Sequence, residues 1–503
     1  MTEKWSEPGR NPHALRARVL RGTSWKLGSQ IVVQVGRIGF VLILARLLSP
    51  TDFGLVAMAL VVTGFVIAFS DLGLGAALVQ RHSIDERDRS TVFWVGMGAG
   101  ALLTVMGIAL SGPLADFYGE PAVRGLIAGL SLSFIVTALG ATQRALLTRE
   151  MDFRRLELST IAGVYAGGAI GVTGASVGWG PWALVAQQLT IAVVSTVFVW
   201  LAAPWRPRFV FSNASLRSLG GFGGNVLGTR LTYYAQESAL PLIIGRALGS
   251  AALGVFTIAY TIVLVPLTRL AIPVGEVLFP AFSQLQHDRE RMTEFWLRGL
   301  RMLAAFSMPA MAGLIVVAPD LVPVVLGEQW DDAVPVVQIL AWVGLLQALS
   351  AWSGSILMGL GKANTLFRVS IVFLVLYVLA FLVGVQWGIV GTAAAYAIAS
   401  TVLETLYLWL TVHALGISFF RPLRALAGVG QAALGMGVAA AVLRAALVEA
   451  GVAPALRLAA VIGAGTAIYI ALFVWRAPDI LAEARGLRRR HGDEAAAPPA
   501  VGY

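Results

Sequence analysis

The sequence of 503 residues contains no cysteine, which excludes disulfide bonds, thiolate catalysis and cysteine-ligated metal sites. Charged residues are also scarce, at 13%, whereas a soluble protein has about 25%. Hydrophobic residues make up 57% of the chain, much of it in runs long enough to cross a bilayer. These proportions predict an all-α polytopic membrane protein with little soluble mass.

Recognisable catalytic and cofactor motifs are missing as well. The chain has no GxxxxGK[ST] phosphate loop and no HExxH zinc motif, and its five histidines lack ligand spacing. The net charge of +10 does not indicate nucleic acid, because the basic residues lie in short loops between apolar runs. We therefore expect no enzyme activity, no cofactor, no metal and no nucleic-acid partner.

About fourteen apolar runs are predicted to span the membrane. Most Lys and Arg residues fall in alternate loops, and the intervening loops are short or acidic, as at Asp320. The positive-inside rule then places both termini in the cytoplasm. Residues 1–24 are polar, so the first span is expected to act as an uncleaved insertion signal. The spans lie near 25–48, 53–79, 91–112, 122–147, 156–177, 180–202, 218–246, 251–281, 297–318, 333–359, 365–385, 388–412, 423–447 and 454–475.

An internal repeat organises these spans. Trp25–Gln80 aligns with Asn225–Pro280 without a gap, so that Arg46 matches Arg246 and Gly54 matches Gly254. Farther along, Trp179-Gly180 answers Trp387-Gly388. Six crossings per repeat predict two lobes of the same orientation, an arrangement found in transporters. The expected domains are a cytoplasmic tail (1–24), an N-lobe (25–212), a C-lobe (213–416), two extra helices (417–475) and a second cytoplasmic tail (476–503).

Ionisable and polar residues inside the spans are the candidate site. A charge at the bilayer centre costs at least about 2.5 kcal/mol, so it normally faces a partner or a water-filled cavity. Helical spacing places two polar stripes on equivalent spans, which predicts a cavity between the lobes; interhelical ion pairs such as Arg37 with Asp71 are the structural alternative. The expected substrate-binding residues are Gln30, Gln34, Arg37, Arg230, Tyr233, Tyr234 and Arg269, and the expected ion-coupling residues are Asp71, Glu237 and Glu276. Glu404 is open to either a coupling or a structural role, and Gly163, Gly167 and Gly171 predict close helix packing.

Several longer phrases carry a family resemblance. They are LARLLSPTDFGLVAMA (44–59), DLGLGAALVQR (71–81), STVFW (90–94), QRALLTREMDFRRL (143–156), WALVAQQL (182–189), APWRPRF (203–209), VLFPAFSQLQ (277–286) and LGEQWDDAVPVVQILA (326–341). Together they resemble the polysaccharide transporter family of the multidrug/oligosaccharidyl-lipid/polysaccharide exporter superfamily, especially its colanic-acid and teichuronic-acid exporter branch. The resemblance covers about residues 20–415.

The resemblance implies a flippase of the bacterial plasma membrane. Such proteins move undecaprenyl-pyrophosphate-linked oligosaccharide repeat units to the outer leaflet, for exopolysaccharide, capsule or lipopolysaccharide synthesis, by ion-coupled alternating access. The implied partners are the lipid-linked oligosaccharide, membrane lipids, H⁺ or Na⁺, and a polysaccharide polymerase with its co-polymerase. Arginine suits the pyrophosphate because guanidinium binds phosphate bidentately.

Other functions remain open at this point. A lipid II or small-molecule exporter of the same superfamily would share the architecture. An integral-membrane polysaccharide polymerase or ligase is a further alternative, although such enzymes typically have a large outer loop with Arg or His, which is not predicted here. A scaffold of the polysaccharide assembly complex would not need buried charges.

Overall fold

The computed structural model describes residues 12–70, 74–81, 84–213, 238–264, 278 and 282–476. These residues form helices joined by short connections, with no strand among them. Eleven ranges of the described chain are long and apolar enough to cross a membrane. One of these ranges, Asn364–Leu415, contains two helices. Pro50–Val61 is a shorter apolar helical range. The prediction of an all-α polytopic membrane protein with about fourteen helices is confirmed.

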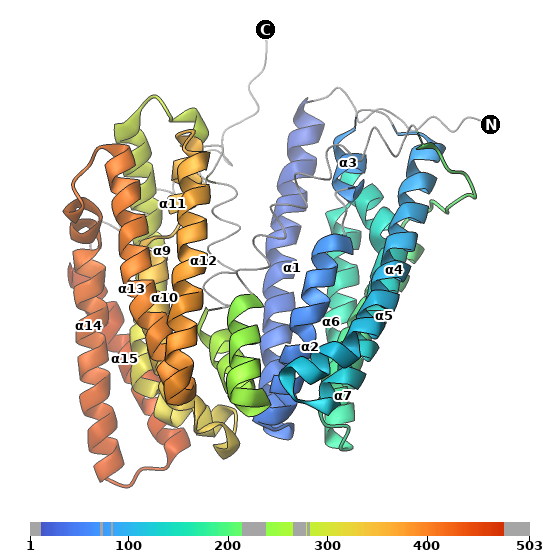
Figure 1. Cartoon of the computed structure of the whole chain (residues 1–503). Coiled ribbons are helices and arrows are strands. Elements are labelled where there is room, and N and C mark those ends of the chain that lie inside the picture. Colours follow the sequence, from blue (N-terminus) through green and yellow to red (C-terminus); the bar gives the residue numbers. More distant parts are fainter. Residues whose placement is uncertain are drawn as a thin grey trace. The chain divides into compact units, whose positions relative to one another are not determined.

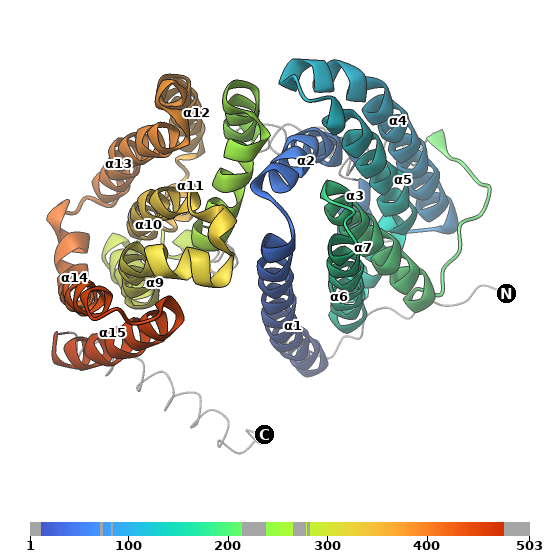
Figure 2. The ribbon, with the colours of Figure 1, turned by 90° about the horizontal axis from the view of Figure 1, so that it is seen from below.

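The chain divides into two compact units, Met1–Gly254 and Val255–Tyr503. In the first unit the neighbour order is α1–α6–α7–α5–α4, with α2 packed on α5, and Figures 1 and 2 show this row (blue to green). Its helices are α1 (Pro12–Leu47), α2 (Pro50–Ser70), α3 (Leu74–Gln80), α4 (Glu86–Tyr118), α5 (Pro121–Arg149), α6 (Phe153–Ser176) and α7 (Pro181–Ala202). The helical stretch Ser238–Leu264 begins in this unit and continues past Gly254.

In the second unit the neighbour order is α15–α14–α9–α10–α13–α12 (yellow to red in Figure 2). The short α11 contacts both α12 and α13. The elements are α9 (Arg289–Val325), the 3₁₀ turn Glu328–Trp330, α10 (Ala333–Leu349), α11 (Ser353–Gly359), α12 (Ala363–Gly384), the 3₁₀ turn Val385–Trp387, α13 (Gly388–Leu415), α14 (Phe420–Glu449) and α15 (Pro454–Arg476).

Turn chemistry sets the helix boundaries that the sequence predicts. Ser49 caps α2: its Oγ and its backbone N–H both donate to Asp52 Oδ2, at 2.7 and 2.9 Å, and the Asp52 N–H donates back to Ser49 Oγ. Pro50 occupies the first helical position, where a missing N–H costs nothing. Ser49-Pro50-Thr51-Asp52, which separates the predicted spans 25–48 and 53–79, is therefore a capping box at the start of α2.

The glycine ridge of α6 packs against α7, as predicted. A Cβ at Gly163 would collide with Ser195 Oγ, and one at Gly171 would lie 3.0 Å from Gln187 Cβ. Because these glycines have no side chain, the two helix backbones approach closely.

Corresponding helices pair in the same way within each unit, while the two-lobe repeat itself stays a prediction. In the first unit α4 packs on α5, α5 on α7 and α7 on α6; in the second, α9 packs on α10, α10 on α13 and α13 on α12. Gly180 and Gly388, which the repeat aligns, begin the equivalent helices α7 and α13. Their φ angles are 54° and 72° with ψ at −133° and −162°, a conformation that is readily available only to glycine.

Asp320 was expected in an outer loop, but α9 continues past it to Val325. Its side chain is 2% exposed and accepts hydrogen bonds from Arg444 Nε at 2.6 Å and Arg457 Nε at 2.8 Å. A second nitrogen of Arg457, Nη2, also donates to the same carboxylate. The carboxylate thus joins α9 to α14 and α15, the two extra helices.

Candidate functional site

Helix α1 carries one of the predicted polar stripes, formed by Gln30, Gln34 and Arg37. One face packs on α6, where Tyr165 OH donates to the carbonyl of Val32 at 3.2 Å and Ser29 Oγ donates to Glu157 at 2.9 Å. Gln30 and Arg37 are exposed and Gln34 is half-buried. Their role as a cavity lining stays a prediction.

The remaining predicted site residues lie outside the described residues. They are Asp71, Arg230, Tyr233, Tyr234, Glu237, Arg269 and Glu276. Their convergence with the α1 stripe stays a prediction.

A cavity in the first unit contains a cation that the sequence did not single out. About 220 Å³ in volume, it lies among α2, α5 and α7. Arg144 of α5 is one of its walls, and hydroxyl and amide side chains provide most of the other polar surface. The lining residues are Leu60, Leu130, Ser133, Thr137, Arg144, Gln188, Ile191, Ala192 and Ser195.

Arg144 has few partners in this cavity. Its Nη2 donates a long hydrogen bond of 3.4 Å to Thr196 Oγ1, and its Nε finds no hydrogen-bond partner among the described residues. None of the described lining residues is acidic. A guanidinium in a confined site without a carboxylate suits a phosphate or another oxyanion, which would take up its remaining donors.

The distribution of charged residues in the sequence does not distinguish Arg144 from the basic residues near it. The sequence places it in the basic group Arg144–Arg155 at the predicted cytoplasmic boundary, where Arg149 has a structural role. Arg149 Nη1 donates to the carbonyl of Leu78 at 2.8 Å and so caps the end of α3. The sequence feature that could have drawn attention to Arg144 is the phrase QRALLTREMDFRRL, which contains it. Arg144 lies near the C-terminal end of α5.

A half-buried carboxyl group in the second unit forms a separate polar cluster. Glu404 of α13 accepts a hydrogen bond from Ser350 Oγ at the end of α10. It has no ion pair among the described residues. One turn before it, Ser400 Oγ lies 3.3 Å from Tyr377 OH of α12. The hydrogen-bond partner of Glu404 among the described residues is therefore a hydroxyl group rather than a cation.

Three tyrosines, Tyr377, Tyr396 and Tyr407, lie close enough to Glu404 to interact with it electrostatically. Tyr377 and Tyr396 pack with their ring centroids 5.2 Å apart, and Tyr407 packs on Phe373 at 5.6 Å. Gln347 Nε2 lies 3.5 Å from Tyr396 OH, at the limit of a hydrogen bond. A carboxyl group among neutral oxygens can hold a proton or a small cation, which are the ligands of a coupling site. No group of His, Asp or Glu in the described chain has the arrangement of a multi-ligand metal site.

The sequence and the fold both have relatives among known proteins. Residues 43–335 match the family described as polysaccharide biosynthesis protein. The succinoglycan biosynthesis transport protein ExoT of Rhizobium meliloti is 30% identical over 69% of this chain and 71% of its own length. The teichuronic acid biosynthesis protein TuaB of Bacillus subtilis is 28% identical over 84% and 90%, and the lipopolysaccharide biosynthesis protein WzxC of Escherichia coli is 29% identical over 77% and 80%.

Two solved structures share the fold at low sequence identity. The lipid II flippase MurJ in an inward closed conformation has a TM-score of 0.70 and 15% identity, covering 92% of this chain and all of that one. An inward-facing multidrug transporter of the MATE family has a TM-score of 0.62 and 17% identity, covering 77% and 95%. These matches are to transport proteins, in agreement with the prediction that the chain is not an enzyme. The chain therefore belongs to the polysaccharide biosynthesis protein family, and it is a multi-pass membrane protein with the fold of these two solved structures.

Proposed function

We propose that this protein is a flippase for undecaprenyl-pyrophosphate-linked oligosaccharide repeat units in the bacterial plasma membrane. Family membership carries the proposal, because ExoT, TuaB and WzxC are all named for surface-polysaccharide pathways. Export of such a unit would serve the synthesis of an exopolysaccharide, capsule or lipopolysaccharide.

Two groups of side chains support a pyrophosphate-bearing substrate. Arg144 offers guanidinium donors in a cavity without a carboxylate, and Arg37 is exposed on α1 beside Gln30 and Gln34. Arginine can engage two phosphate oxygens at once, and it does so most strongly away from bulk water. The amide side chains can hydrogen-bond to sugar hydroxyls.

Ion coupling is the second part of the proposal. Glu404 is the described carboxyl group best suited to exchange a proton or bind Na⁺, because it accepts a hydrogen bond from the Ser350 hydroxyl and has no ion pair among the described residues. Asp71, Glu237 and Glu276 stay candidates for the same role. Alternating access then requires that the binding of the ion and the binding of the substrate are coupled.

Reconstitution tests the proposal directly. Purified protein in liposomes, given a fluorescent lipid-linked oligosaccharide on one side and an imposed proton or sodium gradient, is expected to move it to the opposite leaflet. A membrane-impermeant glycosidase or quencher reports the exposed fraction. A preference for lipid II over the oligosaccharide-linked lipid would favour the alternative exporter, and extension of the glycan in purified liposomes would favour an enzyme.

A further inference from the structure

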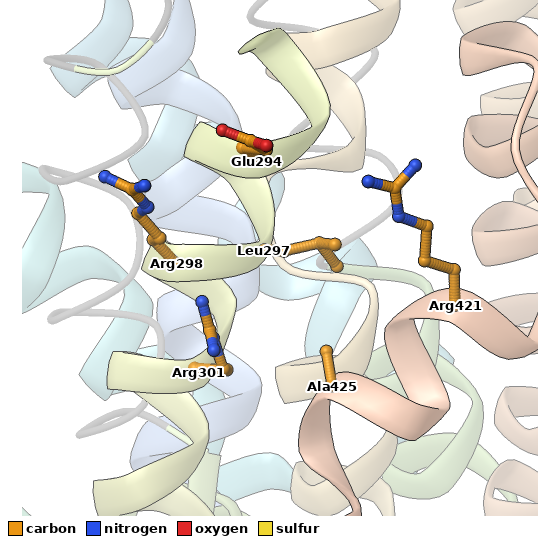
Figure 3. Close-up of a pocket in the computed structure, with 6 residues that line it drawn as sticks. All are labelled: Glu294, Leu297, Arg298, Arg301, Arg421 and Ala425. Carbon is orange, nitrogen blue, oxygen red and sulfur yellow. The ribbon is translucent and has the colours of Figure 1, made fainter. Parts of the chain in front are cut away.

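A second cavity lies in the second unit, and none of the proposed transport residues is among the residues that line it. Its volume is about 320 Å³, and it is formed by α9 and α14. Figure 3 shows Arg298 and Arg301 rising from α9 and Arg421 from α14, with Leu297 and Ala425 between them. Glu294, one turn before Arg298, is the sole acidic residue among the six that line it.

The charge in this cavity favours an anion. Three guanidinium groups stand against one carboxylate, so the lining has an excess of positive charge. Arg298 and Arg421 are exposed, whereas Arg301 is half-buried. Below the cavity, Trp296 and Leu426 belong to the buried apolar core. The ligand must therefore approach from outside the bundle and present its negative charge to the arginines.

An apolar stripe runs along α9 from the same place. Phe295, Met302 and Phe306 are 38%, 39% and 66% exposed, and with Arg298 they share one helical face. Arg301 is followed by the apolar part of α9, so the cavity lies where the helix leaves the membrane, on the side predicted to be cytoplasmic. An anionic head at the arginines and an acyl chain on the stripe fit this arrangement.

We propose that the α9–α14 cavity binds the phosphate headgroup of an anionic phospholipid of the surrounding leaflet. Basic pockets between transmembrane helices on the cytoplasmic side bind such headgroups. The volume suits a small phosphodiester head, because it is at the low end for ligand sites and too small for an oligosaccharide repeat unit. The site would tie the extra helix α14 to α9 through a lipid, independently of what the protein transports.

Lipid retention tests the proposal in the full-length protein. Wild-type protein from nanodiscs with equal phosphatidylglycerol and phosphatidylethanolamine is expected to retain phosphatidylglycerol preferentially in native mass spectrometry. Removing a basic residue near an anionic surface weakens binding about fivefold, so the double variant Arg298→Ala/Arg421→Ala should lose roughly 25-fold. Arg298→Lys/Arg421→Lys keeps the charge but loses the bidentate geometry, and it should fall between the two.

Arg424→Ala is the matched control, since Arg424 is exposed on the same helix but does not line the cavity. It should retain the lipid as the wild type does. Equal losses in Arg424→Ala and the double alanine variant would overturn the proposal, because they would indicate only a diffuse basic surface. Displacement of the lipid by millimolar inorganic phosphate would likewise overturn it in favour of a free-anion site. If the double alanine variant fails to fold, lipid retention by Arg298→Lys/Arg421→Lys is compared with retention by Arg424→Lys instead. Equal losses in these two lysine variants would overturn the proposal in the same way.

Discussion

At the scale of single residues, Arg144 is the guanidinium whose removal should affect transport most directly. Hydrogen bonds to charged groups contribute about 1.5–3 kcal/mol, so Arg144→Ala should lower transport by roughly tenfold to a hundredfold, and Arg144→Lys should restore part of it. The measurement is the initial rate of flipping per folded molecule in liposomes. Arg124→Ala, exposed near the start of the same helix, is the control. Wild-type rates in Arg144→Ala would exclude this cavity from the substrate path.

Substitution of Glu404 should affect the coupling of transport to the ion gradient rather than the binding of substrate. Glu404→Gln keeps an oxygen that can accept from Ser350 Oγ but removes the titratable charge. We expect gradient-driven transport to collapse, while exchange of substrate between leaflets without a gradient continues. Comparison of the two assays provides the measurement, and Glu328→Gln, an exposed acid in the turn after α9, should leave both intact. Full gradient-driven transport in Glu404→Gln would assign coupling to another group.

At the scale of elements, a close crossing joins α2 to the helical stretch that begins at Ser238. A Cβ at Gly54 would collide with the carbonyl oxygen of Ser250, and a Cβ at Gly254 would collide with that of Pro50. Both obstacles are backbone atoms, which cannot move aside as a flexible side chain can. The predicted repeat aligns Gly54 with Gly254, and each of these two glycines meets the backbone of the other's helix.

Gly54→Ala should therefore destabilise the protein, by about 1–3 kcal/mol for overpacking. The readout is the thermal unfolding midpoint in detergent. Gly39→Ala in α1 is the control, because nothing lies within 4 Å of its Cβ position and alanine favours a helix by about 1 kcal/mol. An unchanged midpoint in Gly54→Ala would mean that the crossing is looser than described.

The link between α9 and the two extra helices depends on one carboxylate. Asp320→Asn would leave Arg444 and Arg457 facing a neutral group, and removing one partner of an ion pair destabilises the fold because the remaining charges lose their compensation. We expect a lower unfolding midpoint and faster proteolysis within α14 and α15, measured by limited digestion. Asp331→Asn, an exposed acid beyond α9, should behave as the wild type. Resistance of Asp320→Asn to both treatments would show that apolar packing alone holds these helices.

At the scale of the whole molecule, the topology can be read by chemical labelling, since the parent chain has no cysteine. Met151→Cys, between α5 and α6, should react only from the cytoplasmic side, and Asp331→Cys only from outside. The reason is the distribution of Lys and Arg among alternate loops. Impermeant maleimide on intact cells and on inverted vesicles provides the measurement. Labelling of both positions from one side would contradict the fourteen-span topology.

The sequence by itself determined the class of protein and much of its local structure. Apolar runs predict spans because hydrocarbon requires every backbone group to bond within a helix. The Ser49–Asp52 turn and the glycine ridge of α6 were also predictable, because capping boxes and small-residue spacing act over a few neighbouring residues. The family followed from phrases distributed along the chain.

Only the tertiary structure decided which distant polar groups meet. Asp320 binds arginines from two later helices, Glu404 accepts a hydrogen bond from Ser350 at the end of α10, and Arg144 lines a cavity beside α7. Residues more than a hundred positions apart form the first of these contacts, and neither hydrophobic period nor motif spacing specifies such pairs. In a membrane chain most helices are apolar on every face, so helix neighbours are set by side-chain packing, which composition does not reveal.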